Sequence, residues 1–170
     1  MNMLGPIAGT LEYERAENLK LARSVPEDIC DRLPGGLVQS PCWIVCHFCL
    51  ADTLQRESIT SDTPGFDKAF FDEFGPESDF AMARTHMNAR FGSWSDAIEA
   101  AAASHAKLVD AIRNADLDRL LAPHPNERVR AWFPTLASNI SYALWHEGNH
   151  GGQLRAWIHA AKHAGLLPTD

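Results

Sequence analysis

Residues 145–154 read Trp-His-Glu-Gly-Asn-His-Gly-Gly-Gln-Leu and lie inside a long run with helical periodicity. The stretch places His146 and His150 four residues apart. On an α-helix, with about 3.6 residues per turn, such positions lie on one face and one turn apart. Both rings can therefore reach the same metal ion if a third ligand comes from elsewhere in the chain.

The two histidines also fall on the apolar side of their predicted helix. At about 100° per residue, a sector centred near His146 and His150 collects the apolar residues Leu136, Ile140, Ala143, Leu154, Trp157 and Ala161. His159 and His163 are also four residues apart, but they fall on the opposite face. We therefore expect the first pair to face the core and the second pair to be solvated surface residues.

The rest of the chain also predicts helices. Helical spacing of apolar residues gives four long elements at 11–22, 41–54, 96–114 and about 134–163. No alternation of period two and strand length is present, and there is no internal repeat. Four main helices with one long connection are typical of a helix bundle. We therefore predict an all-α chain, with residues 1–170 forming one four-helix-bundle domain.

The ends of these helices have recognisable signals. Ser93 is a candidate N-cap for the third long helix. Pro134 suits the first turn of the last one, which Gly165 and Pro168 then end. The crossing at 56–92 is interrupted at 64–65 and 75–76, and we expect short helical pieces there. Its packing should come from phenylalanines at 66, 70, 71, 74, 80 and 91.

Composition limits the classes of function. The formal net charge is -7 and no Lys/Arg stripe is present, which argues against nucleic acid as a partner. No apolar run approaches the roughly 20 residues that span a bilayer, and the first residues show no signal peptide. The cysteines at 30, 42, 46 and 49 form a poor disulfide framework. Free thiols favour a cytoplasmic location.

The third metal ligand is best sought on another helix. His47 shares a helical face with Trp43, Ile44, Ala51 and Leu54. An imidazole in such surroundings is costly unless its nitrogens are satisfied. Binding a metal through one nitrogen and donating from the other would satisfy both. Three other histidines are weaker candidates, because they lie in the irregular crossing, among surface-like alanines or between prolines: His86, His105 and His124.

Two blocks of sequence resemble the DinB/YfiT-like superfamily of metalloenzymes. Residues 43–47 are similar to its Trp-x-x-x-His helix, and residues 146–154 to its His-x-x-x-His-x-Gly-Gln ending. The resemblance implies a bundle in up-down-down-up order, with the long crossing between its second and third helices. It implies His47, His146 and His150 as metal ligands. It also implies a homodimer, and a small-molecule substrate that can include a low-molecular-weight thiol.

Two rival motifs fit the chain poorly. His146-Glu147-x-x-His150 matches the zinc-protease motif, but no Glu follows Glu147, and Ala156 stands six residues beyond His150, where a ligand is expected. Cysteines 42, 46 and 49 match the radical-SAM spacing. That motif lies on a loop after a strand, whereas this segment is predicted to be a buried helix.

Three neutral imidazoles leave open positions on a divalent ion, which is typical of catalytic sites. Zinc or nickel is expected first, and iron or manganese also suits imidazole. Glu147 is a candidate catalytic base or hydrogen-bond acceptor, with a salt bridge as the alternative. Gln153 could hydrogen-bond a ligand histidine or a facing helix. Glycines 148, 151 and 152 suggest close helix approach or a local bulge beside the metal.

We therefore expect a metal-dependent hydrolase or small-thiol S-transferase. The alternative is a non-catalytic, metal-stabilised binding or interaction module. A third possibility is an empty site in which the histidines hydrogen-bond to one another.

Overall fold

The computed structural model describes residues 4–60 and 67–169, and the regular structure in these residues is helical. The α-helices are α1 (Gly5–Arg23), α2 (Pro41–Thr60), α3 (Lys68–Phe74), α4 (Ala83–Phe91), α5 (Trp94–Arg113), α6 (Leu117–Leu121), α7 (Glu127–Arg130) and α8 (Leu136–His163). Short 3-10 turns cover Glu27–Ile29, Pro34–Gly36 and Phe80–Met82. Within the described ranges there is no β-strand, only an isolated bridge between Pro123 and Thr135. The prediction of an all-α chain is confirmed.

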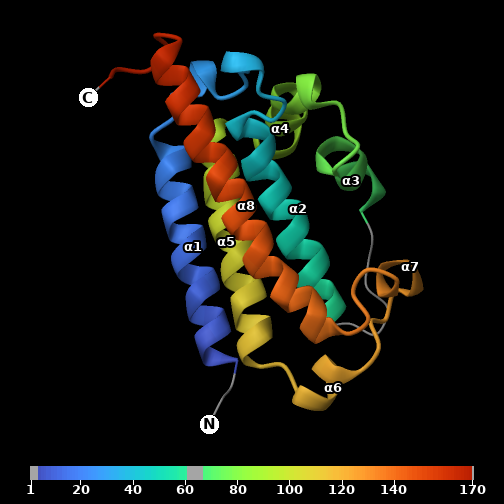
Figure 1. The fold of residues 1–170 in the computed structure, drawn as a ribbon. Helices are drawn as coiled ribbons and strands as arrows, with labels where there is room; N and C mark the ends of the chain where they lie inside the picture. The colour runs from blue at the N-terminus through green and yellow to red at the C-terminus, as the bar shows by residue number, and fades with distance from the viewer. Residues whose placement is uncertain (1–3, 61–66, 170) are drawn as a thin grey trace.

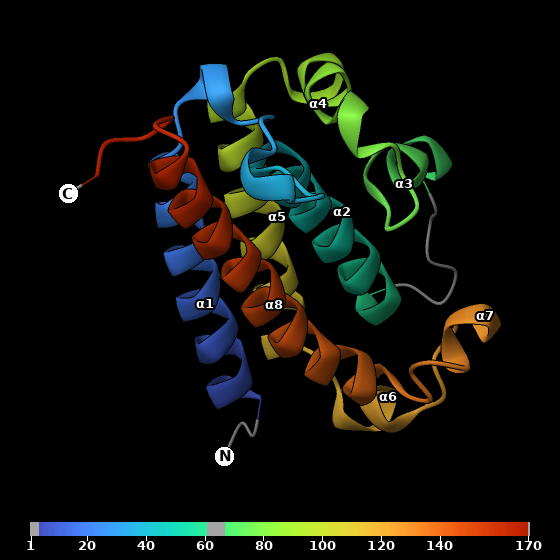
Figure 2. The same ribbon diagram turned by 45° about the horizontal axis from the view of Figure 1, so that its top comes forward.

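Four long helices lie side by side and frame the molecule (Figures 1 and 2). Helices α1 and α8 run in one direction, and α2 and α5 run in the other (Figure 1). Helix α5 packs against both α1 and α2, while α8 packs mainly against α1. Each overlaps a predicted helix, although α1 begins earlier and α2 ends later than expected.

Side-chain caps set where two of these helices begin. Ser93 accepts a hydrogen bond from the backbone N–H of Asp96, as predicted for the start of α5. The prediction that Pro134 lies in the first turn of α8 was wrong, because Thr135 is the N-cap of this helix and Pro134 lies before it. Thr135 and Ser138 form a reciprocal capping box, which satisfies two N–H groups. At the other end, Gly165 takes a positive φ of 70° directly after the C-cap.

Aromatic packing holds the crossing between α2 and α5. Helices α3 and α4 are the expected short pieces, and they lie beside α2 (Figure 1). Phe70 packs edge-on against Phe74 and Phe91, and Phe80 packs edge-on against Trp43. The expected break at 64–65 and Phe66 lie outside the described residues.

Helix α2 is buried along most of its length, which explains its nearly continuous apolar sequence. Its three cysteines, 42, 46 and 49, and Cys30 are buried free thiols. They lie on a helix, so the loop arrangement of a radical-SAM cluster is absent from them. Among the helices of the described residues, none combines the length and the apolar character needed to cross a bilayer.

Candidate metal centre

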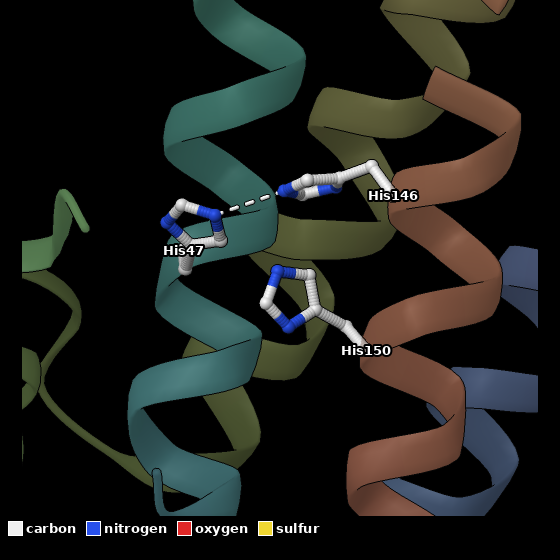
Figure 3. Close-up of side chains that lie close together, drawn as sticks. All are labelled: His47, His146 and His150. Atoms are coloured by element: carbon white, nitrogen blue, oxygen red, sulfur yellow. Dashed lines mark hydrogen bonds between the residues drawn. The ribbon is translucent and has the colours of Figure 1, made fainter. Parts of the chain in front are cut away.

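Three imidazoles meet between α2 and α8. His47 projects from α2, and His146 and His150 project from successive turns of α8 (Figure 3). One ligand nitrogen from each ring lies within 4.8 Å of the others. The Nε2 atoms of His47 and His146 are 2.9 Å apart. The structure therefore brings together the three histidines that the sequence analysis selected.

A backbone carbonyl in the segment between α2 and α5 determines which ring nitrogen of His47 carries the proton. Its Nδ1 lies 2.7 Å from the carbonyl oxygen of Phe74, which can only accept a hydrogen bond. Nδ1 must therefore carry the proton, and the lone pair on Nε2 points toward His146. It follows that His146 donates its own Nε2–H to His47 across the 2.9 Å contact.

A side chain one turn further along α8 orients the third ring. The Nδ1 of His150 donates to the Oε1 of Gln153 over 2.5 Å. Its Nε2 is thereby left as an acceptor that faces the other two rings. Metal-binding histidines commonly donate their second nitrogen in this way, which fixes the tautomer and the ring orientation. The expected hydrogen bond between Gln153 and a histidine of this group is present, and the role of that histidine as a metal ligand stays a prediction.

Aromatic rings surround the imidazoles. Trp43 stacks on His47 with ring centroids 4.5 Å apart, and Phe48 packs edge-on against His150 at 5.7 Å. The ring centroids of Tyr142 and His146 are 5.8 Å apart. His146 and His150 are each only 5% exposed. The three nitrogens therefore converge in apolar surroundings.

These surroundings keep the imidazoles neutral. Burial, together with charge repulsion from His150, lowers the pKa of His47 to about 4. Burial and the two neighbouring rings lower the pKa of His146 to about 2, and burial also lowers the pKa of His150. A neutral imidazole is the form that binds a metal.

The donor set fits a divalent ion bound through nitrogen. A metal–nitrogen bond of about 2.0–2.1 Å in tetrahedral geometry separates two ligand nitrogens by roughly 3.3 Å. His47 and His146 would therefore move apart by a few tenths of an ångström from 2.9 Å. The proton on His146 Nε2 would have to leave that atom. Three ligands would leave one position open, the pattern of catalytic rather than structural sites.

Glu147 does not join this group. Its carboxylate accepts hydrogen bonds from Arg15, at 2.5 and 3.0 Å, and from Asn18 at 3.1 Å. The salt bridge that was the alternative role for Glu147 is therefore formed, and it is buried. A role for Glu147 as a catalytic base stays a prediction.

A second group of donors lies around that salt bridge. Ligand atoms of Asp52, His105 and Glu147 lie within 4.8 Å of one another. The guanidinium of Arg15 bonds both carboxylates. Burial opposes the ionisation of Asp52, but Arg15 and His105 outweigh it and hold the pKa of Asp52 below its ordinary value. This group therefore already contains a cation.

Sequence reasoning missed most of this second group. His105 was expected among surface-like alanines, but it is 4% exposed and bonds Asp52 and the carbonyl of Leu11. Arg15 is 2% exposed. The helical spacing of α1 could have indicated that Arg15 is buried. It lies among the other buried residues of this helix, which are Ala8, Leu11, Asn18, Leu19 and Ala22.

The remaining histidines lie apart from the three-histidine group. His86 packs edge-on against Phe74, and His124 hydrogen-bonds the backbone of Asn126. His159 and His163 are exposed near the end of α8, as predicted, with their Nε2 atoms 3.1 Å apart.

Of the three glycines near the site, one permits a close approach between α8 and α1. A Cβ added at Gly151 would collide with the side-chain oxygen of Asn18 on α1. Gly148 and Gly152 have open space instead. The expectation of close packing therefore holds at one position and is wrong at the other two.

Comparison with known proteins identifies the family. Neither the curated proteins nor the solved structures contain a match to this chain. The family model of the DinB superfamily matches residues 10–154, a range that includes all three imidazoles and most of the long helices. The chain therefore belongs to the DinB superfamily.

Proposed function

We propose that this chain is a metal-dependent enzyme that uses His47, His146 and His150 to hold one divalent ion. Its reaction would be hydrolysis, or the transfer of a low-molecular-weight thiol to a small molecule. Zinc and nickel are the first candidates for the ion, followed by iron and manganese. The observation that carries the proposal is the convergence of three imidazole nitrogens from two helices.

The hydrogen bonds behind two of the rings support this assignment. Phe74 and Gln153 accept from the Nδ1 atoms of His47 and His150, so both Nε2 lone pairs are directed toward the shared point. The surrounding aromatic rings reduce competition from water. When bound, a divalent ion in such a site activates water or stabilises a thiolate. The chain's own contribution is to hold and orient the three rings.

Metal analysis tests the assignment directly. Protein purified without added metal should carry about one ion per chain, and His150→Ala should carry none. His163→Ala is the matched control, because it removes one of two exposed imidazoles with the same spacing on the same helix. A wild-type protein that neither carries metal nor takes up Zn²⁺ or Ni²⁺ would contradict the proposal.

Activity should then follow the metal. We expect the wild-type protein to show turnover in a screen that combines thiol conjugation with ester and amide hydrolysis. His150→Ala should lose that turnover and His163→Ala should keep it. Glu147→Gln tests the predicted base separately when the protein is saturated with metal, because the loss of a base lowers the turnover number even with the ion bound.

Burial favours a second candidate, a metal-stabilised binding module without catalysis. His146 and His150 are nearly covered, and an ion at this point would tie α8 to α2. The two functions differ in their response to chelation. Removal of the metal from an enzyme should abolish turnover with a modest change in melting temperature. Removal from a structural site should unfold the chain and no turnover should exist beforehand.

We further propose that the four long helices form an up-down-down-up bundle and that the protein is a cytoplasmic homodimer. The directions of α1, α2, α5 and α8 support the bundle (Figure 1). The four free thiols suit a reducing compartment. Light scattering at several concentrations tests the dimer, and a monomer at all of them would contradict it.

A further inference from the structure

Arg15 is buried, and its side chain forms hydrogen bonds with three other helices. Its Nη1 donates to Asp52 on α2 at 2.8 Å and to the carbonyl of Ala101 on α5 at 3.1 Å. Its Nε and Nη2 donate to Glu147 on α8, and Nη2 also donates to Asp52 at 3.2 Å. A guanidinium has five N–H donors, and here five hydrogen bonds use them. One side chain of α1 thus connects all four long helices.

The guanidinium takes the place of a metal cation. Asp52, His105 and Glu147 bring donor atoms within 4.8 Å of one another, a set of two carboxylates and one imidazole that could otherwise bind an ion. Ser104 adds a hydrogen bond to Asp52. Because Arg15 sits between the carboxylates, their charges are compensated inside the bundle. Buried carboxylates without that cation would be strongly destabilising.

The same guanidinium holds the part of α8 that carries the histidines. Glu147 directly follows His146. Asn18 donates to the backbone carbonyl of Glu147 at 3.0 Å. Arg15 and Asn18 therefore anchor both the side chain and the backbone of the residue next to a ligand.

A second connection runs through Phe48. The Arg15 guanidinium lies over its ring at 4.1 Å from the centroid. The same ring packs edge-on against His146 and His150, at 6.3 and 5.7 Å. Arg15 thus supports the two imidazoles of α8 in two ways, through Glu147 and through Phe48, which contacts both Arg15 and the imidazoles.

We propose that Arg15 is a positioning residue for the three-histidine site: it is a built-in cation that fixes the turn of α8 carrying His146 and His150. The metal-dependent part of this inference rests on the proposed function. The geometric part concerns the imidazoles themselves and can be tested without metal.

Cobalt binding tests the metal-dependent part. Arg15→Lys keeps the positive charge but has three donors in place of five. We expect its affinity for Co²⁺ to fall about 10–100-fold, with a shifted visible absorption spectrum at saturation. Arg23→Lys, on the same helix and in an exposed pair with Glu99, is the matched control and should bind Co²⁺ like the wild type. A lower melting temperature in Arg15→Lys with unchanged affinity and spectrum would overturn the proposal.

Chemical rescue provides an independent measurement. Arg15→Ala leaves space for a free guanidinium ion between Asp52 and Glu147, so millimolar guanidinium should restore Co²⁺ affinity in this variant and not raise it in the wild type. Failure of rescue in a folded Arg15→Ala protein would count against the proposal. If that variant does not fold, Glu147→Gln removes the same ion pair with almost no change of shape. It should show the weakened affinity and shifted spectrum expected of Arg15→Lys.

Imidazole ¹H–¹⁵N spectra of the metal-free protein separate this inference from the proposed function. In Arg15→Lys the signals of His146 and His150 should move, while those of His159 and His163 stay in place. A wild-type protein that binds no Co²⁺ would defeat the metal assignment, yet these spectra would still decide the role of Arg15. Unmoved signals of His146 and His150 would overturn it.

Discussion

Two clusters of metal-compatible side chains meet at neighbouring residues of α8. His146 faces His47 and belongs to a group of three neutral imidazoles, whereas Glu147 faces Arg15 and belongs to a charged group with Asp52 and His105. Both groups hold their donor atoms within 4.8 Å. The difference is that the charged group already contains a cation, and the neutral group has lone pairs directed at a shared point.

The hydrogen bonds of the charged group show how complete it is without a metal. Both ring nitrogens of His105 face oxygen acceptors, the Asp52 carboxylate at 3.3 Å and the Leu11 carbonyl at 3.0 Å. The guanidinium of Arg15 lies between Asp52 and Glu147 and forms an ion pair with each of them. Distance alone therefore does not identify a metal site, because the charge and protonation of the donors decide it.

The largest effect should come from exchanging one residue of each cluster for alanine in metal-free protein. Glu147→Ala leaves Arg15 without one of its two buried carboxylates and should cost about 3–5 kcal/mol of unfolding free energy. His146→Ala removes a neutral ring with one hydrogen bond and should cost about 1–2 kcal/mol. Urea denaturation measures both. Equal losses would mean that the charged cluster is not the stronger structural element.

The three-histidine group was predictable because short local patterns carry its residues, whereas the charged cluster was not. His146 and His150 share one helical turn, and His47 lies in an apolar segment where a lone imidazole is conspicuous. Arg15 is 37 residues from Asp52 and 132 from Glu147. Charged side chains are almost never fully buried unless they are paired, and no local pattern identifies such distant partners.

Spacing alone could have indicated that two of these residues are buried. Arg15 lies on the face of α1 that includes Leu11 and Ala22. His105 lies on the face of α5 that includes Ala101 and Leu108. Periodicity therefore predicted the helices and one of the two clusters, but the identity of the charged partners required the packed structure.

In metal-free protein, the two clusters should lose their contributions to folding stability in different ranges of pH. The pKa of His47 is about 4 in the folded chain and that of His146 about 2, both below the ordinary value near 6.5. The unfolded chain therefore binds these protons more readily, and acid favours unfolding. Stability should fall below about pH 6.5, by up to about 1.4 kcal/mol per pH unit for each histidine.

The charged cluster responds in a lower range of pH. Asp52 has a folded pKa below its unfolded value of 3.8, so its stabilisation is present above that value and is lost only as the pH falls further. Thermal melts between pH 7 and pH 4 therefore report mainly the imidazoles. His146→Ala should show a shallower decline in this range. The same slope in wild type and variant would contradict the assignment.

A smaller effect is expected from the acceptor behind His150. Gln153→Met removes the oxygen that fixes the Nδ1 proton of His150, and the loss of such a partner commonly weakens metal binding about 10–100-fold. Gln153→Glu keeps an acceptor at this position and should bind close to the wild-type level. Competition titrations with a chromogenic chelator measure both variants. Equal weakening would mean that Gln153 acts through packing alone.

The smallest effects should distinguish the side of α8 that packs on α1 from its exposed side. Gly152 has open space around it, so Gly152→Ala should stabilise the chain by about 0.5–1 kcal/mol through helix propensity. Gly151 packs against Asn18, which is held by its bonds to Glu147. Gly151→Ala should therefore destabilise the chain by about 1 kcal/mol or more, since an overfilled contact forces neighbours to shift. Urea midpoints that move in opposite directions would show that α8 is held closely at its charged cluster. If both variants were stabilised, Asn18 would have to move freely, and the anchoring of the histidine-bearing turn through Glu147 would be weaker than its hydrogen bonds indicate.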